Sequence, residues 1–341
     1  MNEFENYGIS HSLKQALNQL NYSVPTEVQK KSIPAILEER NVVCESHTGS
    51  GKTIAFSLPL IERVIQGKSK KVLVVCPTRE LALQVKDEIY KLNKFTGLRA
   101  FAVFGGHGIN LERTELKRNY SFLIATPGRL LDHFRSRTID PPSFDTVVLD
   151  EADRLLDMGF IDDLKKILTQ VNPEKTHLFS ATLRGNVERL IHQYIPDYKE
   201  IRIEQQIIGT NIIEKEITVN RENKFSKLLN IVNSNKGKFL VFVATKRGAD
   251  FLSRKMNNAR IRNAVIHGDK SNKYRIMSLN DFRQGKHNIL IATDVASRGL
   301  QINNVDYVVN YDQARDYHTH VHRIGRTGRM GQKGTAINFS E

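Results

Sequence analysis

The chain has few of the features that mark secreted or membrane-bound proteins. Only two of its 341 residues are cysteines, Cys44 and Cys76. Each lies in a short apolar run, so we interpret both as core residues and not as a disulfide or metal pair. No apolar stretch approaches the roughly 18 residues of a membrane span, and the first residues lack the basic-then-apolar plan of a signal peptide. We therefore expect a soluble cytoplasmic protein without a membrane partner.

Obvious linkers and repeats are also missing. No Pro/Gly/Ser-rich segment, low-complexity tract or short repeat interrupts the chain. The length nevertheless predicts about two domains, each large enough to bury a core. The best boundary lies near Glu204–Asn211, where Gly209 is a breaker and a new strand-like run, Glu216–Val219, follows. We expect a first domain over residues 1–205, a linker over 206–212 and a second domain over 213–341.

The chain contains fewer acidic than basic residues. The chain has 51 Lys and Arg against 37 Asp and Glu, which gives a net charge of +14 and a pI near 9.7. Such an excess favours a polyanionic partner, with nucleic acid first and an anionic membrane surface second. Charge alone leaves a merely soluble basic protein as an alternative.

Short apolar runs alternate with longer amphipathic segments along the whole chain. This alternation is typical of βα units and predicts an α/β fold with mostly parallel sheets flanked by helices. The runs that we interpret as strands are Asn41–Cys44, Val72–Cys76, Phe122–Ala125, Thr146–Leu149, Leu178–Phe179, Glu216–Val219, Phe239–Val243, Ile289–Ala292, Tyr307–Val309 and Gly334–Phe339.

Small hydroxyl or charged residues follow many of these runs. Because ligands of open α/β sheets bind beyond the carboxyl ends of the strands, recurring polar residues at these positions indicate one functional edge. The alternative is that these residues only cap the helices that follow the strands. Capping accounts well for one or two such strand ends and less well for six. The residues concerned are Thr78, Arg79, Thr126, Asp150, Ser180, Thr182, Thr245 and Thr293.

The most informative of these strand ends is the acidic segment Asp150-Glu151-Ala152-Asp153, which follows the apolar run Thr146–Leu149. Such a run is typical of a strand buried on both faces. Three carboxylates at its end repel one another unless a cation or a proton lies among them. The alternative is a solvated acidic loop.

A glycine-rich segment from Ser46 to Thr53 lies between the predicted strand Asn41–Cys44 and a predicted helix, Ile54–Val64. Such a turn before a helix offers backbone N–H groups and a positive helix end to phosphates. Lys52 would contact the β- and γ-phosphates and the Thr53 hydroxyl would bind Mg²⁺. The usual pattern begins with glycine where Ser46 stands. The N–H groups belong to Thr48, Gly49, Ser50 and Gly51.

Together, the phosphate loop and the acidic segment indicate a nucleotide hydrolase. Asp150 would hold Mg²⁺, through water, and Glu151 would orient or deprotonate the attacking water.

The chain resembles the DEAD-box ATP-dependent RNA helicases of superfamily 2 over nearly its whole length. The resemblance rests on motifs that occur in the family's order. They are Tyr22–Gln29 with Phe4 upstream, Ser46–Thr53, Pro77–Gln84, Gly105-Gly106, Thr126–Arg129, Asp150–Asp153, Ser180–Thr182, Phe242–Lys246, His267–Arg275, Thr293–Ile302 and His322–Arg329.

The resemblance implies two RecA-like domains, with ATP and Mg²⁺ in the cleft and RNA across both domains. Phe4 would stack on the adenine and Gln29 would hydrogen-bond its edge. Arg326 and Arg329 would act as arginine fingers on the γ-phosphate, and Gln301 would lie at the ribose. The residues that would couple the ATP site to RNA, with Ser180 and Thr182 bonding Asp153, are Asp153, Ser180, Thr182 and His322.

The resemblance also implies that single-stranded or duplex RNA is bound mainly through its backbone, without strong base preference. The 2′-OH would distinguish RNA from DNA. We expect a monomer, with ribonucleoprotein or ribosome-assembly partners compatible with the motifs. The RNA contacts would be Thr78, Arg79, Gly106, Thr126, Gly128 and Arg129 in the first domain, and Thr245, Thr293 and Arg298 in the second.

The sequence departs from the family pattern at three places besides Ser46. Asn272 replaces a Gln of many members, and Gln301 replaces an Asp, which removes a charge near the ribose. The chain ends at Glu341, where the family usually continues with a further helix.

We expect an RNA-dependent ATPase that unwinds short duplexes locally. The alternatives are an ATP-gated RNA clamp or ribonucleoprotein scaffold with little unwinding, and a DNA translocase. The presence of Lys52, Glu151, Arg326 and Arg329 argues against an inactive enzyme. The adenine-reading motif and the DEAD sequence argue against a DNA translocase.

Overall fold

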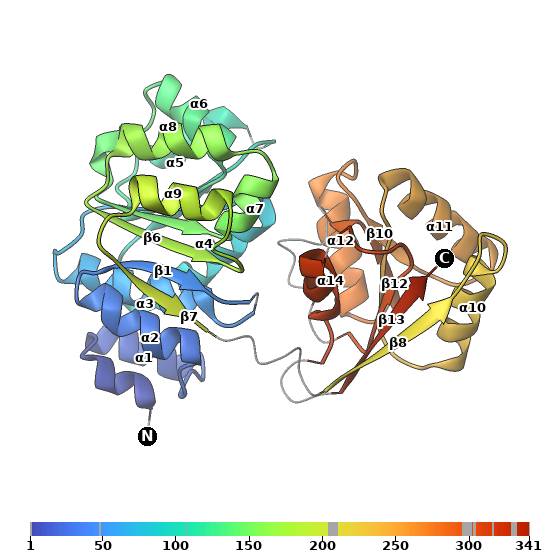
Figure 1. Cartoon of the computed structure of the whole chain (residues 1–341). Helices are drawn as coiled ribbons and strands as arrows, with labels where there is room; N and C mark the ends of the chain where they lie inside the picture. The colour runs from blue at the N-terminus through green and yellow to red at the C-terminus, as the bar shows by residue number, and fades with distance from the viewer. Residues whose placement is uncertain are drawn as a thin grey trace. The chain divides into compact units, whose positions relative to one another are not determined.

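The computed structural model describes residues 2–47, 49–106, 108–203, 211–294, 302, 305–315, 317–328 and 333–340, without the side chains of residues 272, 273, 317, 318 and 322. The chain forms two compact units that divide between residues 205 and 206. Each unit is a parallel β-sheet with helices on both faces (Figure 1). The predicted fold class, two α/β units with mostly parallel sheets, is therefore confirmed.

The first unit contains a seven-stranded sheet in the order β3-β4-β2-β5-β6-β1-β7, and all its described strand pairs are parallel. Its strands are β1 (Asn41–Glu45), β2 (Val72–Val75), β3 (Ala100–Val103), β4 (Phe122–Ala125), β5 (Thr146–Asp150), β6 (Lys175–Ser180) and β7 (Tyr198–Arg202).

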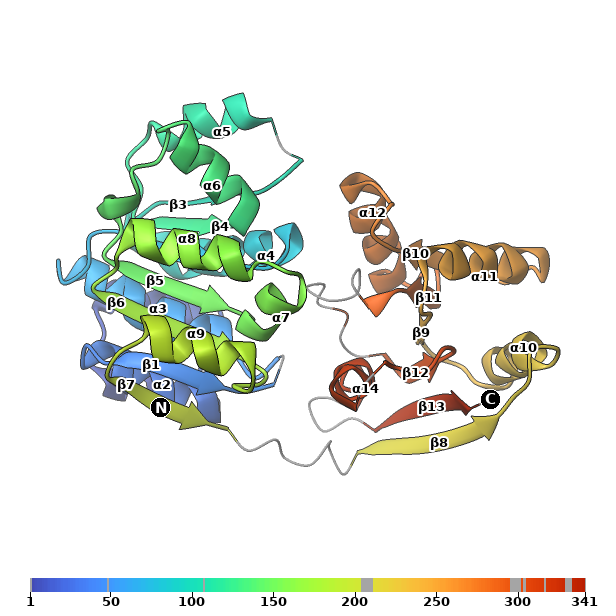
Figure 2. The same ribbon diagram turned by 45° about the horizontal axis from the view of Figure 1, so that its top comes forward.

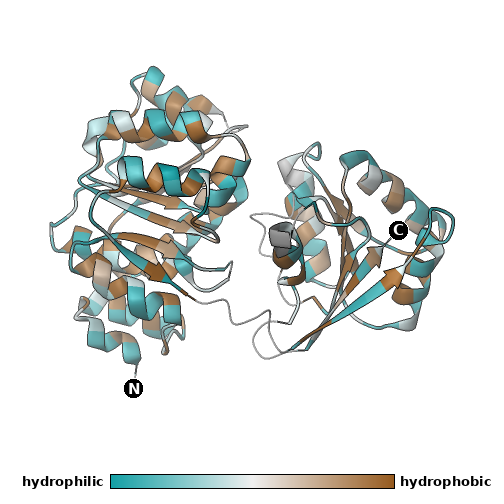
Figure 3. Ribbon diagram, in the orientation of Figure 1, coloured by the Kyte–Doolittle hydropathy of each residue, from teal (hydrophilic) through white to brown (hydrophobic). Residues whose placement is uncertain are grey.

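Two hydrophobic clusters pack the helices of this unit against opposite faces of the sheet. One face carries α1 (His11–Gln19), α2 (Glu27–Leu37), α3 (Lys52–Ile65) and α4 (Arg79–Leu92). The other carries α5 (Ile109–Leu116), α6 (Pro127–Arg135), α7 (Ala152–Asp157), α8 (Ile161–Val171) and α9 (Asn186–Tyr194). Short 3₁₀ turns lie at Glu3–Tyr7, Asn93–Phe95 and Pro141–Ser143. Figure 3 shows the apolar strands between helices that are apolar on one side only.

The second unit contains a six-stranded parallel sheet in the order β10-β11-β9-β12-β13-β8. One face packs against α10 and α11, and the other against α12. The elements are β8 (Ile212–Thr218), α10 (Lys224–Ser234), β9 (Phe239–Phe242), α11 (Lys246–Asn258), β10 (Ala264–Ile266), α12 (Asn272–Arg283), β11 (Ile289–Ala292), β12 (Tyr307–Asn310), α14 (Tyr317–Ile324) and β13 (Gly334–Ser340).

Each apolar run that we interpreted as a strand lies in or overlaps one, and three strands were missed. β7 was missed because it is an edge strand whose side chains are mostly exposed, so it has no apolar run. β10 has only three residues, and β3 is the half-buried opposite edge.

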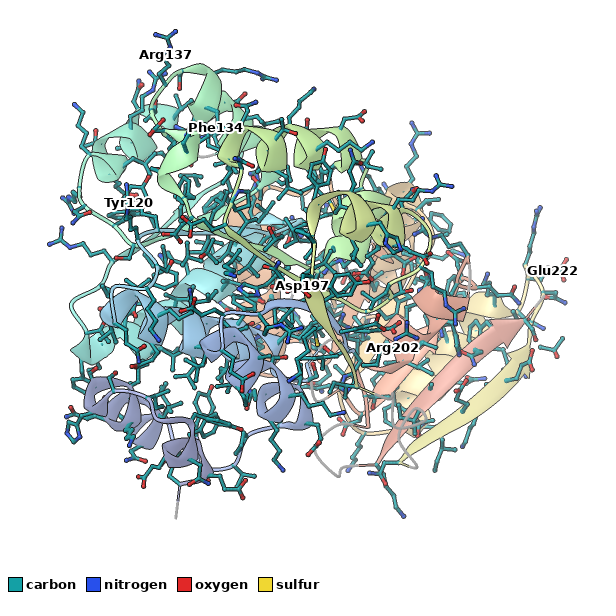
Figure 4. The ribbon with its side chains drawn as sticks, turned by 60° about the vertical axis from the view of Figure 1, so that its left-hand side comes forward. Tyr120, Phe134, Arg137, Asp197, Arg202 and Glu222 are labelled. Carbon is teal, nitrogen blue, oxygen red and sulfur yellow. The ribbon has the colours of Figure 1, made fainter. Side chains whose placement is uncertain are left out.

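The segment between the units was predicted as a linker over 206–212, and its residues 206–210 lie outside the described ones. β8 begins at Ile212, inside that predicted linker. Arg202 ends β7, and its Nε lies 3.7 Å from Glu45 Oε2. Figure 4 labels Arg202 and also Glu222, which projects outward from the segment between β8 and α10.

The parallel strands bring the predicted functional residues of the first unit to one edge. β1 pairs with β6 so that Glu45 lies opposite Ser180, and β5 pairs with β6 so that Asp150 lies opposite Phe179. The phosphate loop, the acidic segment and the segment after β6 therefore leave the sheet side by side. Among the described residues, no helix is long and apolar enough to cross a membrane.

Candidate active site

The phosphate loop connects β1 to α3 and is held by its own polar groups. The Ser46 N–H donates to the Ser180 carbonyl at 2.9 Å. The Lys52 ammonium donates to the Ser46 carbonyl at 3.0 Å, and Lys52 is only 7% exposed. Gly49 and Gly51 have φ values of 87° and 95°, which only glycine adopts readily. The loop thus places a buried cation at the N-terminus of a helix, where anions bind.

Ser46 fits the position where the family pattern has glycine. Its φ is not positive, so a side chain causes no backbone strain there. The residue is 1% exposed, and its hydroxyl lies 3.2 Å from the Ser50 hydroxyl. The Cys44 thiol lies 3.8 Å from the Ser46 hydroxyl. The Ser46 side chain is therefore accommodated by polar contacts within the loop.

Gln29 joins the start of α2 to the phosphate loop. Its Oε1 accepts from the Thr26 N–H at 3.0 Å, as part of a capping box, and its Nε2 donates to the Gly51 carbonyl at 3.1 Å. A side chain at Gly51 would come within 2.5 Å of Gln29 Nε2. An amide has two donor hydrogens and two acceptor lone pairs, so each end keeps the capacity for one adenine contact. The adenine role of Gln29 stays a prediction.

Phe4 is buried in the same part of the unit. The residue is 1% exposed, and its ring contacts Tyr7 edge to face, with 6.1 Å between centroids. The predicted stacking on adenine would require one face of this ring to be uncovered. It remains a prediction.

Asp150 is an acidic residue whose negative charge is costly in its buried position. It is 2% exposed, and its Oδ1 has no hydrogen-bond partner in the part of the chain that the structure describes. Burial, together with the neighbouring Glu151 carboxylate, raises the pKa of Asp150 to about 7, and Lys52 opposes the rise. A buried carboxylate with an unused oxygen next to a second carboxylate fits a Mg²⁺ site, as does the half-buried Thr53 hydroxyl on the first turn of α3.

Glu151 has an unusual backbone and a specific partner. Its φ of 51° lies in the left-handed region, and it is 5% exposed. Its carboxylate forms an ion pair with Arg154, one turn along α7. Arg154 is itself 5% exposed. Sequence reasoning missed Arg154, although an arginine three residues after a glutamate on a helix is a recognisable pairing signal.

Asp153 and Ser180 connect the acidic segment to the end of β6. The Ser180 hydroxyl accepts from the Asp153 N–H at 3.1 Å, and the Asp153 carboxylate accepts from the Ala181 N–H at 3.4 Å. Thr182 contacts Ser180 through its N–H at 3.4 Å, while its hydroxyl accepts from the Arg184 N–H. Of the two predicted bonds to Asp153, only that from Ser180 is present among the described contacts.

The predicted RNA contacts of the first unit lie on segments that follow β2, β3 and β4. Thr78 caps α4, because its hydroxyl accepts from the Leu81 N–H at 3.3 Å. The Arg79 guanidinium lies against Gly106, where a Cβ would approach its Nη1 to 2.1 Å. Gly106 has a φ of 80°. Thr126 is the N-cap of α6, and a Cβ at Gly128 would meet no described atom within 4 Å.

Arg129 is held inside the unit by Glu112. The Arg129 Nη1 lies 2.6 Å from Glu112 Oε2, and the same oxygen lies 2.8 Å from His133 Nε2. The other Glu112 oxygen accepts from the Phe104 N–H at 3.2 Å. Glu112 therefore ties the end of β3 to the start of α6, beside both RNA-contact segments. An RNA contact by Arg129 would have to compete with this ion pair, and sequence reasoning missed Glu112 and His133.

In the second unit, Thr245 caps α11 by accepting from the Gly248 N–H at 2.9 Å, and Thr293 follows β11 at 5% exposure. Arg323, which sequence analysis did not single out, forms several contacts with described residues. It binds Asp294 with two hydrogen bonds of 2.6 and 2.8 Å and lies 5.0 Å from the Phe242 ring. Arg326 is 5% exposed.

Known proteins resemble the chain in both sequence and structure. The family "DEAD/DEAH box helicase" matches residues 26–190, and "Helicase conserved C-terminal domain" matches residues 223–331. The ATP-dependent RNA helicase DbpA of Bacillus subtilis is 40% identical over 99% of this chain and 72% of its own length. The chain belongs to the DEAD-box ATP-dependent RNA helicase family. CshA of Listeria monocytogenes is also 40% identical, over 99% of this chain and 66% of CshA.

Two solved structures extend the comparison. Dbp5 of S. cerevisiae bound to RNA and ADP BeF3 is 30% identical, covers 100% of this chain and 90% of its own, and superposes with a TM-score of 0.86. A hypothetical ATP-dependent RNA helicase from Sulfolobus tokodaii is 39% identical, covers 97% of each chain and gives a TM-score of 0.56. Both support the assignment of this helicase to the ATP-dependent enzymes of the family.

Several predicted site residues of this helicase cannot be placed. Thr48, Arg298, Gln301 and Arg329 lie outside the described residues, as do the side chains of Asn272 and His322. Their predicted roles stay predictions.

The burial of Asp150 predicts a pH-dependent effect of Asp150→Asn on stability. The folded-state pKa is raised above the ordinary value of 3.8, so Asp150 costs stability as pH rises from about 4 through about 7. At about pH 8 the nucleotide-free variant should unfold a few degrees higher than the wild type, because 1 kcal/mol corresponds to roughly 2–4 °C at this size. The difference should shrink toward about pH 4.

Thermal unfolding across this pH range, without and with Mg²⁺, tests the prediction. Asp162→Asn, an exposed carboxylate on α8, is the matched control and should show neither effect. Mg²⁺ should stabilise the wild type more than the Asp150 variant. A pH-independent difference between Asp150→Asn and wild type would contradict the assignment of a costly buried charge.

Proposed function

We propose that this DEAD-box protein binds RNA across both units and unwinds short RNA duplexes locally, and that RNA stimulates its ATP hydrolysis. The observation that carries the proposal is Asp150, a buried carboxyl with an unused oxygen, beside Lys52 of the phosphate loop and Glu151. Structural support of the fold does not require a buried carboxyl with one oxygen lacking a hydrogen bond, because such a group destabilises the domain. A cation that assists a reaction on a phosphate would use such an oxygen as a ligand.

The residues around the loop have distinct roles in the proposed reaction. Lys52 and the N–H groups at the start of α3 bind the phosphates of ATP. Thr53 and Asp150 would hold Mg²⁺, which would neutralise phosphate charge. Glu151 orients the attacking water and accepts its proton. Arg326 and Arg329 of the second unit stabilise the charge that develops on the γ-phosphate.

The contacts between Asp153 and Ser180 support coupling of ATP hydrolysis to RNA. Ser180 accepts from Asp153 and, through its carbonyl, from Ser46, so the phosphate loop and the acidic segment meet at one residue. A change at the γ-phosphate can shift the segment that follows β6 through these short contacts. Such a shift would change the RNA affinity, and by linkage RNA would change the ATP affinity.

Steady-state ATPase activity with and without single-stranded RNA tests the proposed function. We expect RNA to raise the rate at least tenfold, and single-stranded DNA of the same sequence to raise it far less, because the 2′-OH is absent. A strand-displacement assay on a short duplex accompanies it. RNA binding and ATP-dependent retention without displacement would instead indicate an RNA clamp, and equal stimulation by DNA would refute the choice of RNA.

A further inference from the structure

The positive charge of the chain is concentrated in the second unit. Residues 1–205 contain 28 Lys and Arg against 26 Asp and Glu, a net charge of +2. Residues 206–341 contain 23 against 11, a net charge of +12. Both units carry predicted RNA contacts at their strand ends, so those contacts alone do not account for a charge difference of this size. The excess points to a further polyanion-binding surface on the second unit.

The outer face of α11 carries a stripe of arginines around an exposed aromatic ring. Arg247, Phe251 and Arg254 are spaced four and three residues apart, so they lie on one side of the helix. All three residues are exposed, and the exposed fraction of Phe251 is 53%. The opposite side packs into the core through Ala249, Leu252 and Met256. Core packing therefore fixes which side of α11 the arginines occupy.

Neighbouring residues extend this stripe. The Lys255 ammonium lies 5.0 Å from the Phe251 ring and 5.1 Å from the Phe225 ring of α10, and cation–π contacts of this kind hold both groups in place. Arg260 and Arg262 follow the helix and are exposed. The one acidic residue of α11 is Asp250, and it is paired with His267 at 3.1 Å and Lys270 at 2.9 Å. The stripe is therefore basic without a facing carboxylate on its own helix.

The stripe leads away from the predicted RNA contacts of the second unit. α11 begins directly after Thr245, at the carboxyl edge of the sheet, and the chain returns to the opposite edge before β10 begins. From Arg247 to Arg254 the helix rises roughly 10 Å. Figure 2 shows α11 on the outside of its sheet, and no described helix of the second unit lies over its outer side. A strand of RNA that leaves the carboxyl edge over Thr245 would pass Arg247 first and then Phe251.

We propose that Arg247, Phe251, Arg254, Lys255, Arg260 and Arg262 form a second RNA-binding surface, which holds the single-stranded RNA flanking the segment bound at the strand ends. The guanidinium groups bind successive phosphates, and a base stacks on the free face of Phe251. The inference rests on the proposed function in that RNA is the substrate. Repeated arginines with an exposed ring favour a nucleic acid over a protein, whose complementary surface would need a matching acidic patch.

RNA length separates the two surfaces in an experiment on the full chain. An oligonucleotide of about ten residues fills a single site, and one of about forty also reaches the surface on α11. The variant is Arg254→Glu with Arg262→Glu. The matched control is Lys68→Glu with Lys70→Glu, two exposed lysines before β2, which changes the net charge equally. Fluorescence anisotropy gives the affinity for both RNAs between low and moderate salt.

We expect the α11 variant to bind the long RNA about tenfold more weakly, with a salt slope lower by roughly 0.7 for each lost phosphate contact. Its affinity for the short RNA, and ATPase activity with saturating short RNA, should match the wild type. The control should bind both RNAs as the wild type does. Phe251→Ala, which keeps the charge, should weaken binding of the long single strand by roughly tenfold, within the usual range for one stacked base.

Three results would overturn the inference. The first is that the α11 variant binds the long RNA as tightly as the wild type, which would leave a protein partner as the occupant of this face. The second is an equal loss of affinity for the short and the long RNA. The third is an equal loss of affinity in the lysine control. Failure of the proposed function is a separate result, because it would appear as absent RNA stimulation of ATPase activity in the wild type.

Discussion

Glu151→Gln should leave the affinities for ATP and RNA near those of the wild type and remove nearly all ATP turnover. Glutamine has the same shape as glutamate, but it cannot accept a proton from water. General-base catalysis contributes typically about 10²–10⁴-fold, and we expect a loss of this size in kcat. The surrounding fold should survive, because Glu151 contributes to the site through its carboxylate and its left-handed backbone, and glutamine changes only the carboxylate.

The ion pair with Arg154 makes this prediction more specific. In Glu151→Gln the Arg154 guanidinium keeps a hydrogen-bond acceptor, the amide oxygen, but loses the charge of its partner. The loss of the Glu151 charge also removes one of the causes that raise the pKa of Asp150, so Asp150 ionises more readily and Mg²⁺ binding should not weaken.

Single-turnover and steady-state ATPase rates, together with ATP and RNA affinities, test the substitution. Glu115→Gln, an exposed glutamate on α5, is the matched control and should behave as the wild type. Turnover of Glu151→Gln within a few-fold of the wild type would show that another group activates the water. Lost ATP affinity would show instead that Glu151 acts in binding.

The sequence predicted the elements that depend on local pattern. Apolar β-branched runs predicted most strands of both sheets, because a strand buried on both faces must be apolar at every position. The phosphate loop and the acidic segment could be placed at strand ends for the same reason. The edge strand β7 was not predicted, because most of its side chains are exposed and it therefore has no continuous apolar run.

The side-chain contacts at the site depended on distant pairings that no local pattern reports. Glu112 lies 17 residues before Arg129 and 21 before His133, and only the tertiary fold brings the three together. The same holds for Arg323 and Asp294, which are 29 residues apart. Gln29 is an instructive exception. Its hydrogen bond with Thr26 belongs to a capping box, which is a local sequence pattern. Its hydrogen bond with Gly51 depends on the tertiary fold.

Lys52→Ala should weaken ATP binding itself, by roughly 10- to 100-fold, because a charge-assisted hydrogen bond contributes about 1.5–3 kcal/mol. Lys52 is buried at the start of α3, and its ammonium lies 3.0 Å from the Ser46 carbonyl. It is therefore already oriented over the loop, and little side-chain entropy remains to be lost when phosphate binds. Alanine removes the charge and leaves the loop backbone, with Gly49 and Gly51, intact.

Magnesium should enlarge the effect of Lys52→Ala. Lys52 lowers the pKa of Asp150, so its removal favours the protonated, non-ligating form of that carboxyl. The loss of affinity should therefore be greater for ATP with Mg²⁺ than for ATP without it, and greater at about pH 6.5 than at about pH 8.5. Lys70→Ala, which removes an exposed lysine, is the control. Calorimetric titration with and without Mg²⁺ measures both effects. Unchanged affinity would exclude Lys52 from phosphate binding, and a loss independent of Mg²⁺ and pH would separate Lys52 from Asp150.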